Sequence, residues 1–460
     1  MIESETLKVL LIPAYLGRSG EELASFPLGL AYLLTNLKKH ECTLFDPNMV
    51  KRPFVETQKI TEKTDPDVIA LSLRNIDTTQ SWDVFSYFQA FESMLRLIKR
   101  INPDAKIVVG GTGFSMFSRQ IMARLPEIDY GVFLEGEYSF PELLETMDHP
   151  ERVTGVYFRN GGRVVFTGKR KPIDFNSLPE PPRELPQLDL RKYKEVAFSM
   201  GVQTKRGCPF RCAYCTYPFL QGRNMRLRSP GNVVDEIENL VDLHDFKELF
   251  FADTIFNFPL DHARKICREI IKRKLHIKSR AWFREDYINK RFMIEVRDSG
   301  CDHFEFSPDG ASQEALDILQ KDIGIRDVIK TWQLVNEVEG VKAVFNFMYN
   351  VPGENPRTVA SFYKFLFKMV AKYWKRLESV GLTNIRIYPY TKIYQIALKQ
   401  GIIKEETDLL SPTFYNPSPT NIAYLPLTQF RAPLDKLLMA LHLLSNKMSQ
   451  HTYELARDMD

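Results

Sequence analysis

The stretch Lys205-Arg206-Gly207-Cys208-Pro209-Phe210-Arg211-Cys212-Ala213-Tyr214-Cys215 places three thiols at positions i, i+4 and i+7. A chain that coils once around an iron–sulfur cubane can present three such thiolates to three of its irons. Because cubanes are normally held by four cysteines, three leave one iron open, much as an open position marks a catalytic zinc site. The spacing therefore predicts a cluster with one iron available for chemistry.

Two alternatives to the cluster remain open. The thiols could be small buried apolar groups, or they could be three ligands of a structural zinc ion. Zinc would need a fourth ligand, and the closest flanking candidates, His149 and His244, are distant in the sequence. The other cysteines, Cys42, Cys267 and Cys301, are scattered and predict no disulfide framework. A reducing cytoplasm is therefore the expected location.

Length and charge limit the class of protein. A chain of 460 residues is long enough for two or three domains. Its net charge of +4 argues against a protein built mainly to bind nucleic acid. It has no apolar run of about 18 residues, so no transmembrane segment is expected. Residues 1–5 carry acids and no basic region before an apolar core, so no signal peptide is expected.

Residues 1–150 alternate short apolar runs with amphipathic segments. This alternation predicts a doubly wound parallel sheet, in which ligands bind beyond the carboxyl ends of the strands. At one such end the Gly110-Gly111 pair permits close backbone approach to a ligand. The pair is not a GxGxxG fingerprint, so a nicotinamide cofactor is disfavoured, and by itself it could be a tight turn. The expected strands are 8–12, 42–45, 68–73, 106–109 and 130–134.

A hairpin and a stiff connection follow the first domain. Two strand-like segments, 153–158 and 163–166, flank Asn160-Gly161-Gly162, which is a hairpin signal. Residues 172–186 are rich in proline and therefore stiff and extended. We interpret them as the link to a second domain, in which strands and helices alternate again from 200 to about 390, ending in a strand at 384–388.

The CxxxCxxC motif, with Tyr214 before its last cysteine, resembles the radical S-adenosylmethionine (SAM) enzymes. The resemblance implies that SAM chelates the open iron of a [4Fe-4S] cluster. It also implies that one electron, from a donor such as flavodoxin or ferredoxin, cleaves SAM to a 5′-deoxyadenosyl radical. The six strands expected after residue 200 match the partial (β/α)6 barrel of that superfamily, whose chemistry lies at the carboxyl ends of the strands.

Motifs upstream resemble the cobalamin-binding domain that precedes the radical SAM core in one large subfamily. They are the segment 27–33, Asp46, Gly110-Gly111 and Glu135-Gly136-Glu137, in that order. The DxHxxG signature is absent, because no histidine stands two positions after Asp46. The resemblance thus implies cobalamin with no histidine on its lower face. The cobalamin-binding residues that it implies are Ser72, Leu73, Gly110, Gly111, Thr112, Glu135 and Gly136.

The resemblance also assigns roles in the barrel. Tyr214 would pack against the adenosyl group, and Asp253 would contact the methionyl part of SAM. Pro352 belongs to a Pro-Gly-Glu turn near the adenine, and Asp309 occupies the ribose position, where relatives usually have Glu-Ser. Each acid could instead cap a helix or form a turn.

Side chains around the cysteines leave further alternatives. The basic residues there could form a solvated face, or they could bind the cobalamin phosphate or an acidic substrate. Trp282 and Arg284 could line the substrate cavity or belong to core and rim. The basic residues are Lys205, Arg206, Arg211, Arg223, Arg226 and Arg228.

The predicted fold is α/β in four parts. A cobalamin-binding, Rossmann-like sheet spans 1–150, and a hairpin with a proline-rich linker spans 151–199. A radical SAM core with a partial TIM-like barrel spans 200–395, and a C-terminal extension with an amphipathic helix at 433–457 spans 396–460. The first domain is expected to have a core of its own.

Three hypotheses for function follow. The first is a cobalamin-dependent radical SAM methyltransferase that methylates an unactivated carbon of a small-molecule or natural-product substrate. The second keeps both cofactors but catalyses ring contraction or cyclisation without methyl transfer. The third is a cluster-bearing or cobalamin-sensing binding protein that does not cleave SAM. The sequence does not name the substrate.

Overall fold

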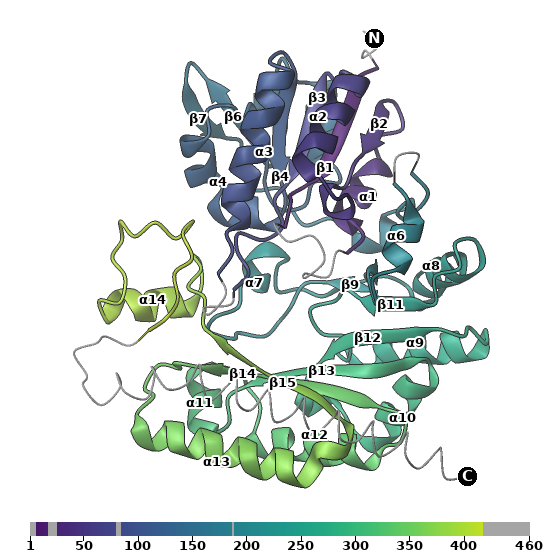
Figure 1. Ribbon diagram of the computed structural model, residues 1–460, viewed down its shortest axis with the longest axis vertical. Helices are drawn as coiled ribbons and strands as arrows, with labels where there is room; N and C mark the ends of the chain where they lie inside the picture. The colour runs from purple at the N-terminus through teal and green to yellow at the C-terminus, as the bar shows by residue number, and fades with distance from the viewer. Residues whose placement is uncertain (1–5, 17–24, 80–83, 186–187, 417–460) are drawn as a thin grey trace.

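The computed structural model describes residues 6–16, 25–79, 84–185 and 188–416. Two sheets follow one another along the long axis, with the cysteine loop between them (Figure 1). No helix among the described residues is long and apolar enough to cross a membrane. The amphipathic helix expected at 433–457 lies outside the described residues.

The first sheet has seven strands in the order β2-β1-β3-β4-β5-β6-β7, and its first five strands are parallel. The direction of winding reverses between β1 and β3, and such a reversal opens a crevice beyond the carboxyl ends of the strands. The doubly wound prediction is therefore confirmed. The parallel strands are β1 Lys8–Pro13, β2 Glu41–Leu44, β3 Val68–Ser72, β4 Lys106–Gly110 and β5 Tyr130–Val132.

Helices cover both faces of this sheet. Ser86 caps α3 by accepting a hydrogen bond from the Gln89 amide at 3.3 Å. The sequence pattern did not predict α2, because the residues that this helix buries are Thr57 and Thr61 rather than apolar ones. The helices are α1 Leu28–Leu34, α2 Pro53–Thr64, α3 Tyr87–Ile101, α4 Thr112–Arg124 and α5 Ser139–Glu145.

The expected hairpin extends the first sheet. Its strands are β6 Val156–Asn160 and β7 Arg163–Phe166, and β6 pairs with β5 in antiparallel fashion. The connecting Gly161 and Gly162 have φ angles of +55° and +81°, which suit a tight hairpin turn. The sheet therefore runs to Phe166 rather than ending before residue 150.

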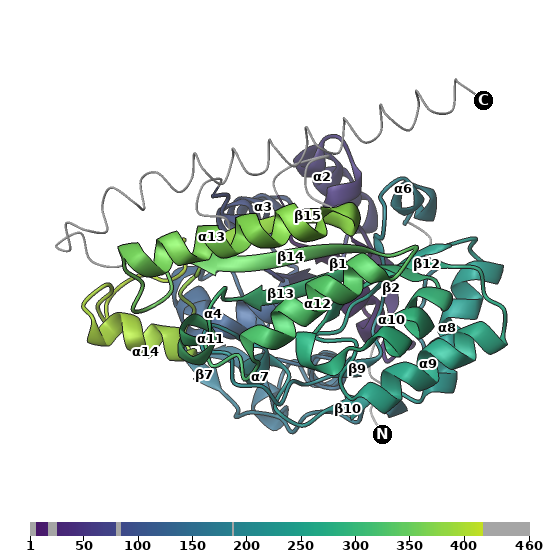
Figure 2. The same cartoon turned by 90° about the horizontal axis from the view of Figure 1, so that it is seen from below.

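The second sheet has six parallel strands in the order β15-β14-β13-β12-β11-β8. It curves into a half-barrel whose outer face is covered by helices (Figure 2). Asn355 starts the longest of these, α13, by accepting hydrogen bonds from the Arg357 and Thr358 amides at 3.0 and 3.2 Å. The strands are β8 Met200–Val202, β11 Glu248–Phe251, β12 Lys278–Phe283, β13 Cys301–Asp309, β14 Lys342–Tyr349 and β15 Leu377–Asn384. The helices are α8 Pro230–Asp242, α9 Leu260–Lys272, α10 Lys290–Asp298, α11 Gln313–Ile318, α12 Ile325–Glu337 and α13 Pro356–Tyr373.

The strand expected at 384–388 was misplaced, because β15 ends at Asn384. Ile385 and Ile387, which suggested a strand, are buried against the first domain instead. The following segment, which includes α14 Lys392–Lys399, is fixed to that domain by a buried ion pair of 2.8 Å between Arg386 and Asp77.

The two sheets do not have separate cores. Val9 and Leu11 of β1 belong to one hydrophobic cluster that also contains barrel residues. Leu10 and Ile12, on the opposite face of the strand, belong to a second cluster that contains residues of the 385–415 segment. The expected separate core is therefore wrong. The shared packing holds the two sheets in a fixed relation, which a site between them requires.

Candidate active site

A cavity of about 720 Å³ lies between the two sheets. One wall is formed by Pro13, Ser72 and Gly110, the last residues of β1, β3 and β4, and the reversal in winding lies between the first two of these strands. The other wall comes from the inner face of the half-barrel, with Gly201, Phe250, Arg280, Trp282 and Glu305.

Six of the seven residues expected to bind cobalamin line this cavity, and Leu73 does not. The Leu73 amide donates to the Gly110 carbonyl at 2.9 Å, and its carbonyl accepts from the Gly113 amide at 2.9 Å. Leu73 therefore holds the glycine turn in place. The six lining residues are Ser72, Gly110, Gly111, Thr112, Glu135 and Gly136.

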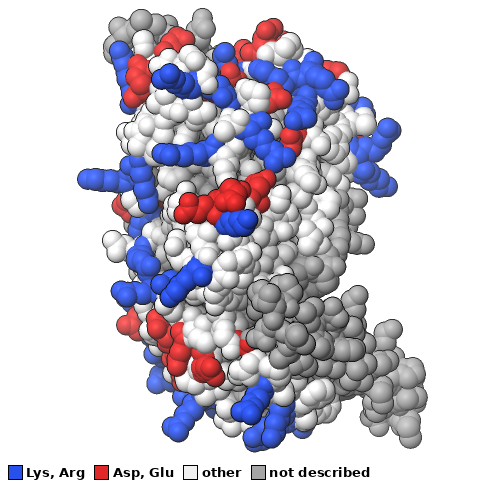
Figure 3. Space-filling view, turned by 90° about the vertical axis from the view of Figure 1, so that its left-hand side faces the viewer, with Lys and Arg blue, Asp and Glu red and all other residues white. Residues whose placement is uncertain are grey.

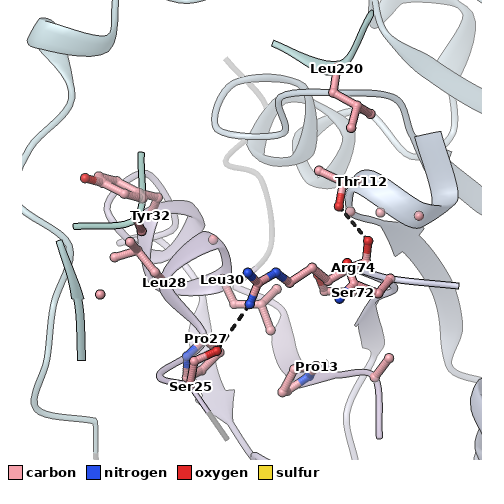
Figure 4. Close-up of a pocket in the computed structure, with 18 of the residues that line it drawn as sticks. Pro13, Ser25, Pro27, Leu28, Leu30, Tyr32, Ser72, Arg74, Thr112 and Leu220 are labelled. Atoms are coloured by element: carbon pink, nitrogen blue, oxygen red, sulfur yellow. Dashed lines mark hydrogen bonds between the residues drawn. The ribbon is translucent and has the colours of Figure 1, made fainter. Parts of the chain in front are cut away.

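Glycines form part of this wall, and at Gly111 the close backbone leaves no room for a side chain. Gly111 has φ +97°, and a Cβ there would lie 2.6 Å from the Leu73 carbonyl oxygen. A Cβ on Gly29 of α1 would meet no atom within 4 Å. Thr112 donates to the Arg74 carbonyl at 2.6 Å, and the Arg74 guanidinium reaches Ser25 Oγ at 3.2 Å (Figure 4). At these glycines the wall is backbone, which a flat ligand can approach closely, and apolar side chains of α1 such as Leu28 and Leu30 line the cavity beside them.

Asp46 lines the same wall but its carboxylate is already engaged. It accepts from the Tyr193 hydroxyl at 2.5 Å and from the Asn48 side chain at 2.8 Å. Burial raises its pKa, and these hydrogen bonds oppose the rise. Among the described residues that line the cavity there is no histidine.

The three cysteines lie beside the cavity rather than in its wall. Their loop runs from β9 Lys205–Arg206 to α7 Tyr217–Leu220, and the Cys208 amide donates to the Gly222 carbonyl at 3.0 Å. Burial raises the pKa of each thiol, and the charges of Cys212 and Cys208 raise that of Cys215 further, to about 12. The three thiols are thus close enough to repel one another when ionised, and a cationic centre would relieve that repulsion.

Neither histidine considered as a fourth zinc ligand is free to bind the ion. His149 and His244 pair with Glu151 and Glu184, at 3.3 and 3.4 Å. Within the described ranges, no three His, Cys, Asp or Glu side chains are grouped to hold a single metal ion.

Tyr214 and Asp309 meet in a buried network beside the cysteines. The Tyr214 hydroxyl donates to Asp309, and Lys321 Nζ lies 2.6 Å from the same carboxylate oxygen. Glu285, in the 3-10 turn that follows β12, lies near this pair. Burial raises its pKa to about 7 against the charge of Lys321, and neither carboxylate oxygen has a hydrogen-bond partner. A ribose contact by Asp309 would have to form alongside its contacts with Tyr214 and Lys321.

Asp253 follows β11 and faces the strand that leads to the cysteines. Its carboxylate accepts from the Thr204 amide at 2.8 Å, the Thr204 hydroxyl at 2.6 Å and the Lys205 amide at 3.1 Å. These bonds fix the start of the cysteine loop. Pro352 lies elsewhere, in a small hollow that it shares with Gly310, so the ends of β13 and β14 do meet.

The basic residues near the cysteines are largely paired inside the protein. Arg206 lies 2.6 Å from Glu137 and 3.1 Å from Glu135, and Arg226 lies 2.8 Å from Glu135. The Arg206 guanidinium also stacks 4.3 Å from the centre of the Phe175 ring. We call these four charged residues the clamp, because they join the cavity loop after β5 to the strand before Cys208.

Two further basic residues are equally internal. Lys205 Nζ donates to the Phe256 carbonyl at 2.6 Å, and Arg228 shares Glu236 with Arg183 in a buried triad. The expectation of a solvated face or a free anion site is therefore wrong for Lys205 and Arg228, as it is for the two arginines of the clamp.

The comparisons with known proteins follow this division into two sheets. The model for the B12 binding domain matches residues 22–144, and that for the Radical SAM superfamily matches residues 202–366. This chain belongs to the radical SAM enzymes that carry a cobalamin-binding domain. Its cofactors are a [4Fe-4S] cluster, SAM and cobalamin.

Named relatives of this radical SAM enzyme include two curated proteins and one solved structure. An uncharacterized methyltransferase of Pyrococcus horikoshii is 26% identical over 82% of this chain and 79% of its own length. The anaerobic magnesium-protoporphyrin IX monomethyl ester cyclase of Rubrivivax gelatinosus is 30% identical over 66% of this chain, which spans 55% of the cyclase. The fold is that of the methyltransferase TsrM of Kitasatospora setae, with a TM-score of 0.75 at 20% identity, over 87% of this chain and 76% of that one.

The described residues of this radical SAM enzyme fit the cofactors of its family. Cys208, Cys212 and Cys215 would hold the cluster, since they are three free thiols of one loop and the charges of the first two act on the third. The glycine-lined wall would receive cobalamin, because a side chain at Gly111 would displace the backbone there. Of the two candidates for a substrate wall, Trp282 lines the cavity, whereas Arg284 is buried between Asp286 and the Phe210 ring.

Sequence reasoning missed several residues of this site. Arg280 and Glu305, which form an ion pair in the cavity wall, were not singled out. The signal for Arg280 was available, because it alternates with the buried Ser279 and Ala281 and so had to face into the barrel. Lys321 carried no comparable signal, since it lies in a loop.

Proposed function

We propose that this enzyme methylates an unactivated carbon of a small-molecule substrate. When bound, the cluster with SAM supplies a radical that removes a hydrogen atom, and cobalamin supplies the methyl group. The observation that carries the proposal is the single cavity shared by the glycine-lined wall and the inner face of the half-barrel. A substrate held against the barrel would lie between the two.

The residues divide this work by position. The cysteine loop would hold the cluster at the side of the cavity, where the Thr216–Gln221 segment that follows Cys215 forms part of the wall, including Leu220 (Figure 4). The clamp would hold the cavity loop after β5, on the cobalamin side, in a fixed position relative to that cysteine loop. The shared cores exclude water behind both walls, since Val202 and Val132 are buried in the same cluster.

The remaining expectations are kept as proposals. An electron donor such as flavodoxin or ferredoxin would reduce the cluster in the cytoplasm. Tyr214, Asp253, Asp309 and Pro352 would surround SAM. The domain limits would lie near 199 and 395, and the first limit would move from 150 to beyond β7. No nucleic-acid partner is proposed, in keeping with a face on which acidic and basic side chains are interspersed (Figure 3).

Turnover with methyl-deuterated SAM tests the reaction. We expect the label on a carbon of the product, with release of both 5′-deoxyadenosine and S-adenosylhomocysteine. A product without label, with 5′-deoxyadenosine alone, would eliminate methyl transfer. It would favour ring contraction or cyclisation, the second candidate, which the 30% identity to the cyclase supports. If SAM is not cleaved at all, the binding-protein hypothesis would stand instead.

A further inference from the structure

The inner face of the half-barrel presents one charged pair to the cavity. Among the described lining residues, the six-stranded sheet contributes Arg280 of β12 and Glu305 of β13 as its charged side chains, and they form an ion pair. Glu305 is 6% exposed. The other acids of the cavity wall, Asp46 and those of the clamp, each have a partner behind the wall, although Glu137 Oε2 accepts no hydrogen bond.

Aromatic rings surround this pair. Trp282 lies opposite Glu305 in the parallel ladder, and Phe250 lies opposite Arg280. The Arg280 guanidinium lies 5.3 Å from the centre of the Phe198 ring. Because these three rings also line the cavity, this end of the site combines an apolar body with a pair of opposite charges.

An ion pair with one buried member restricts which ligands can enter. An anion that binds Arg280 alone would leave Glu305 buried and uncompensated, and a cation that binds Glu305 alone would leave the partly exposed Arg280 without this partner. Removing one partner of a buried pair is costly. A ligand with both charges can replace each partner with a charge-assisted hydrogen bond. Because Arg280 and Glu305 are in contact, the two ligand charges must also be near neighbours.

We propose that this end of the cavity binds the headgroup of a free amino acid, with its carboxylate on Arg280, its ammonium on Glu305 and an apolar side chain against Trp282, Phe198 and Phe250. The proposal deepens the proposed function, since it names the substrate class of the same site. A C-terminal or N-terminal peptide residue lacks one of the two charges, so the free amino acid is favoured.

Equilibrium dialysis of the holoenzyme against three probes with one phenyl body tests this inference. L-phenylalanine carries both charges, phenethylamine only the cation and 3-phenylpropanoate only the anion. We expect L-phenylalanine to bind at least about tenfold more tightly than either single-charge probe. Equal binding of the three, or no binding of L-phenylalanine, would overturn the proposal.

Variants of the ion pair test where the preference for L-phenylalanine arises. Arg280→Gln and Glu305→Gln should each abolish this preference. The double variant leaves neither charge without its partner, so it should lose the preference while remaining folded. Arg264→Gln is the matched control, because Arg264 pairs with Glu295 on the outer helices and its side chain has the same 24% exposure as that of Arg280. A preference that survives in the double variant would place the headgroup elsewhere.

The outcome is separable from that of the proposed function. Binding is measured without turnover, whereas methyl transfer is measured by label. A zwitterion preference without methyl labelling would leave the site intact and reject the reaction, and labelled turnover without the preference would do the reverse.

Discussion

The two walls of the cavity recognise ligands by different means. The wall from the first sheet combines the backbone of a glycine turn with apolar side chains of α1, and its acids have partners behind it. The wall from the half-barrel is made of side chains, with Arg280, Glu305 and aromatic rings exposed to the cavity. Backbone recognition suits a constant cofactor, whereas side chains can be exchanged without altering the fold. This difference implies that side chains of the half-barrel wall can be exchanged, and the substrate changed, without altering how the cofactor is bound.

The cysteine loop serves both walls, so its loss has the largest effect. Replacing Cys208, Cys212 and Cys215 by Ala should remove the cluster and abolish SAM cleavage, because these three free thiols are its expected ligands. Iron content and 5′-deoxyadenosine formation measure this. Cys42→Ala, on β2, is the control and should keep both. A triple variant with full iron content and activity would contradict the assignment.

The second prediction breaks the backbone wall alone. Gly111→Val should lower cobalamin occupancy several-fold while iron content is unchanged, because the new Cβ would collide with the Leu73 carbonyl. Occupancy is read from the visible absorption of the purified protein. Gly162→Val is the matched control. It shares the strain of a positive φ, at +81°, but its Cβ meets nothing within 4 Å. Equal cobalamin loss in both variants would assign the effect to strain rather than to the cavity.

The third prediction loosens the clamp that joins the walls. Glu137→Gln removes one of the two carboxylates that pair with Arg206, which is 7% exposed. Because Glu135 remains, the cost should stay below about 3–5 kcal/mol, the cost of a buried charge left without a partner. We expect cluster and cobalamin to remain bound, with more 5′-deoxyadenosine released per labelled product. The ratio of the two products measures this uncoupling. Arg211→Gln, an exposed change within the cysteine loop, should leave the ratio unaltered. An unchanged ratio in Glu137→Gln would show that the clamp only stabilises the fold.

The same contrast explains what the sequence could predict. Gly110-Gly111 and the three cysteines act through backbone or local spacing, so they are visible in a short stretch of chain. Arg206 was misinterpreted because its partner Glu135 is 71 positions away. Arg280 and Glu305 escaped notice because their contact depends on the pairing of β12 with β13. Helix α2 was missed for a different reason, since Thr57 and Thr61 fill its buried face.

The smallest expected effect concerns Glu285, behind the side-chain wall. Its pKa is raised by burial from 4.5 to about 7, so the folded state binds this proton more tightly than the unfolded state does. Stability should therefore fall as pH rises from about 4.5 to about 7, and above that the folded protein carries the full cost, with an upper limit of about 3 kcal/mol.

The variant Glu285→Gln keeps the shape of the side chain and cannot ionise. We expect it to flatten this part of the pH profile and to raise the unfolding temperature at pH 8 but not at pH 4.5. Thermal unfolding across that range provides the measurement, and the exposed change Glu405→Gln should leave the profile as it is. If Glu285→Gln instead lowers stability at pH 8, the carboxylate must be ionised and stabilised there by Lys321, and the half-barrel would hold a second working ion pair behind the one that faces the cavity.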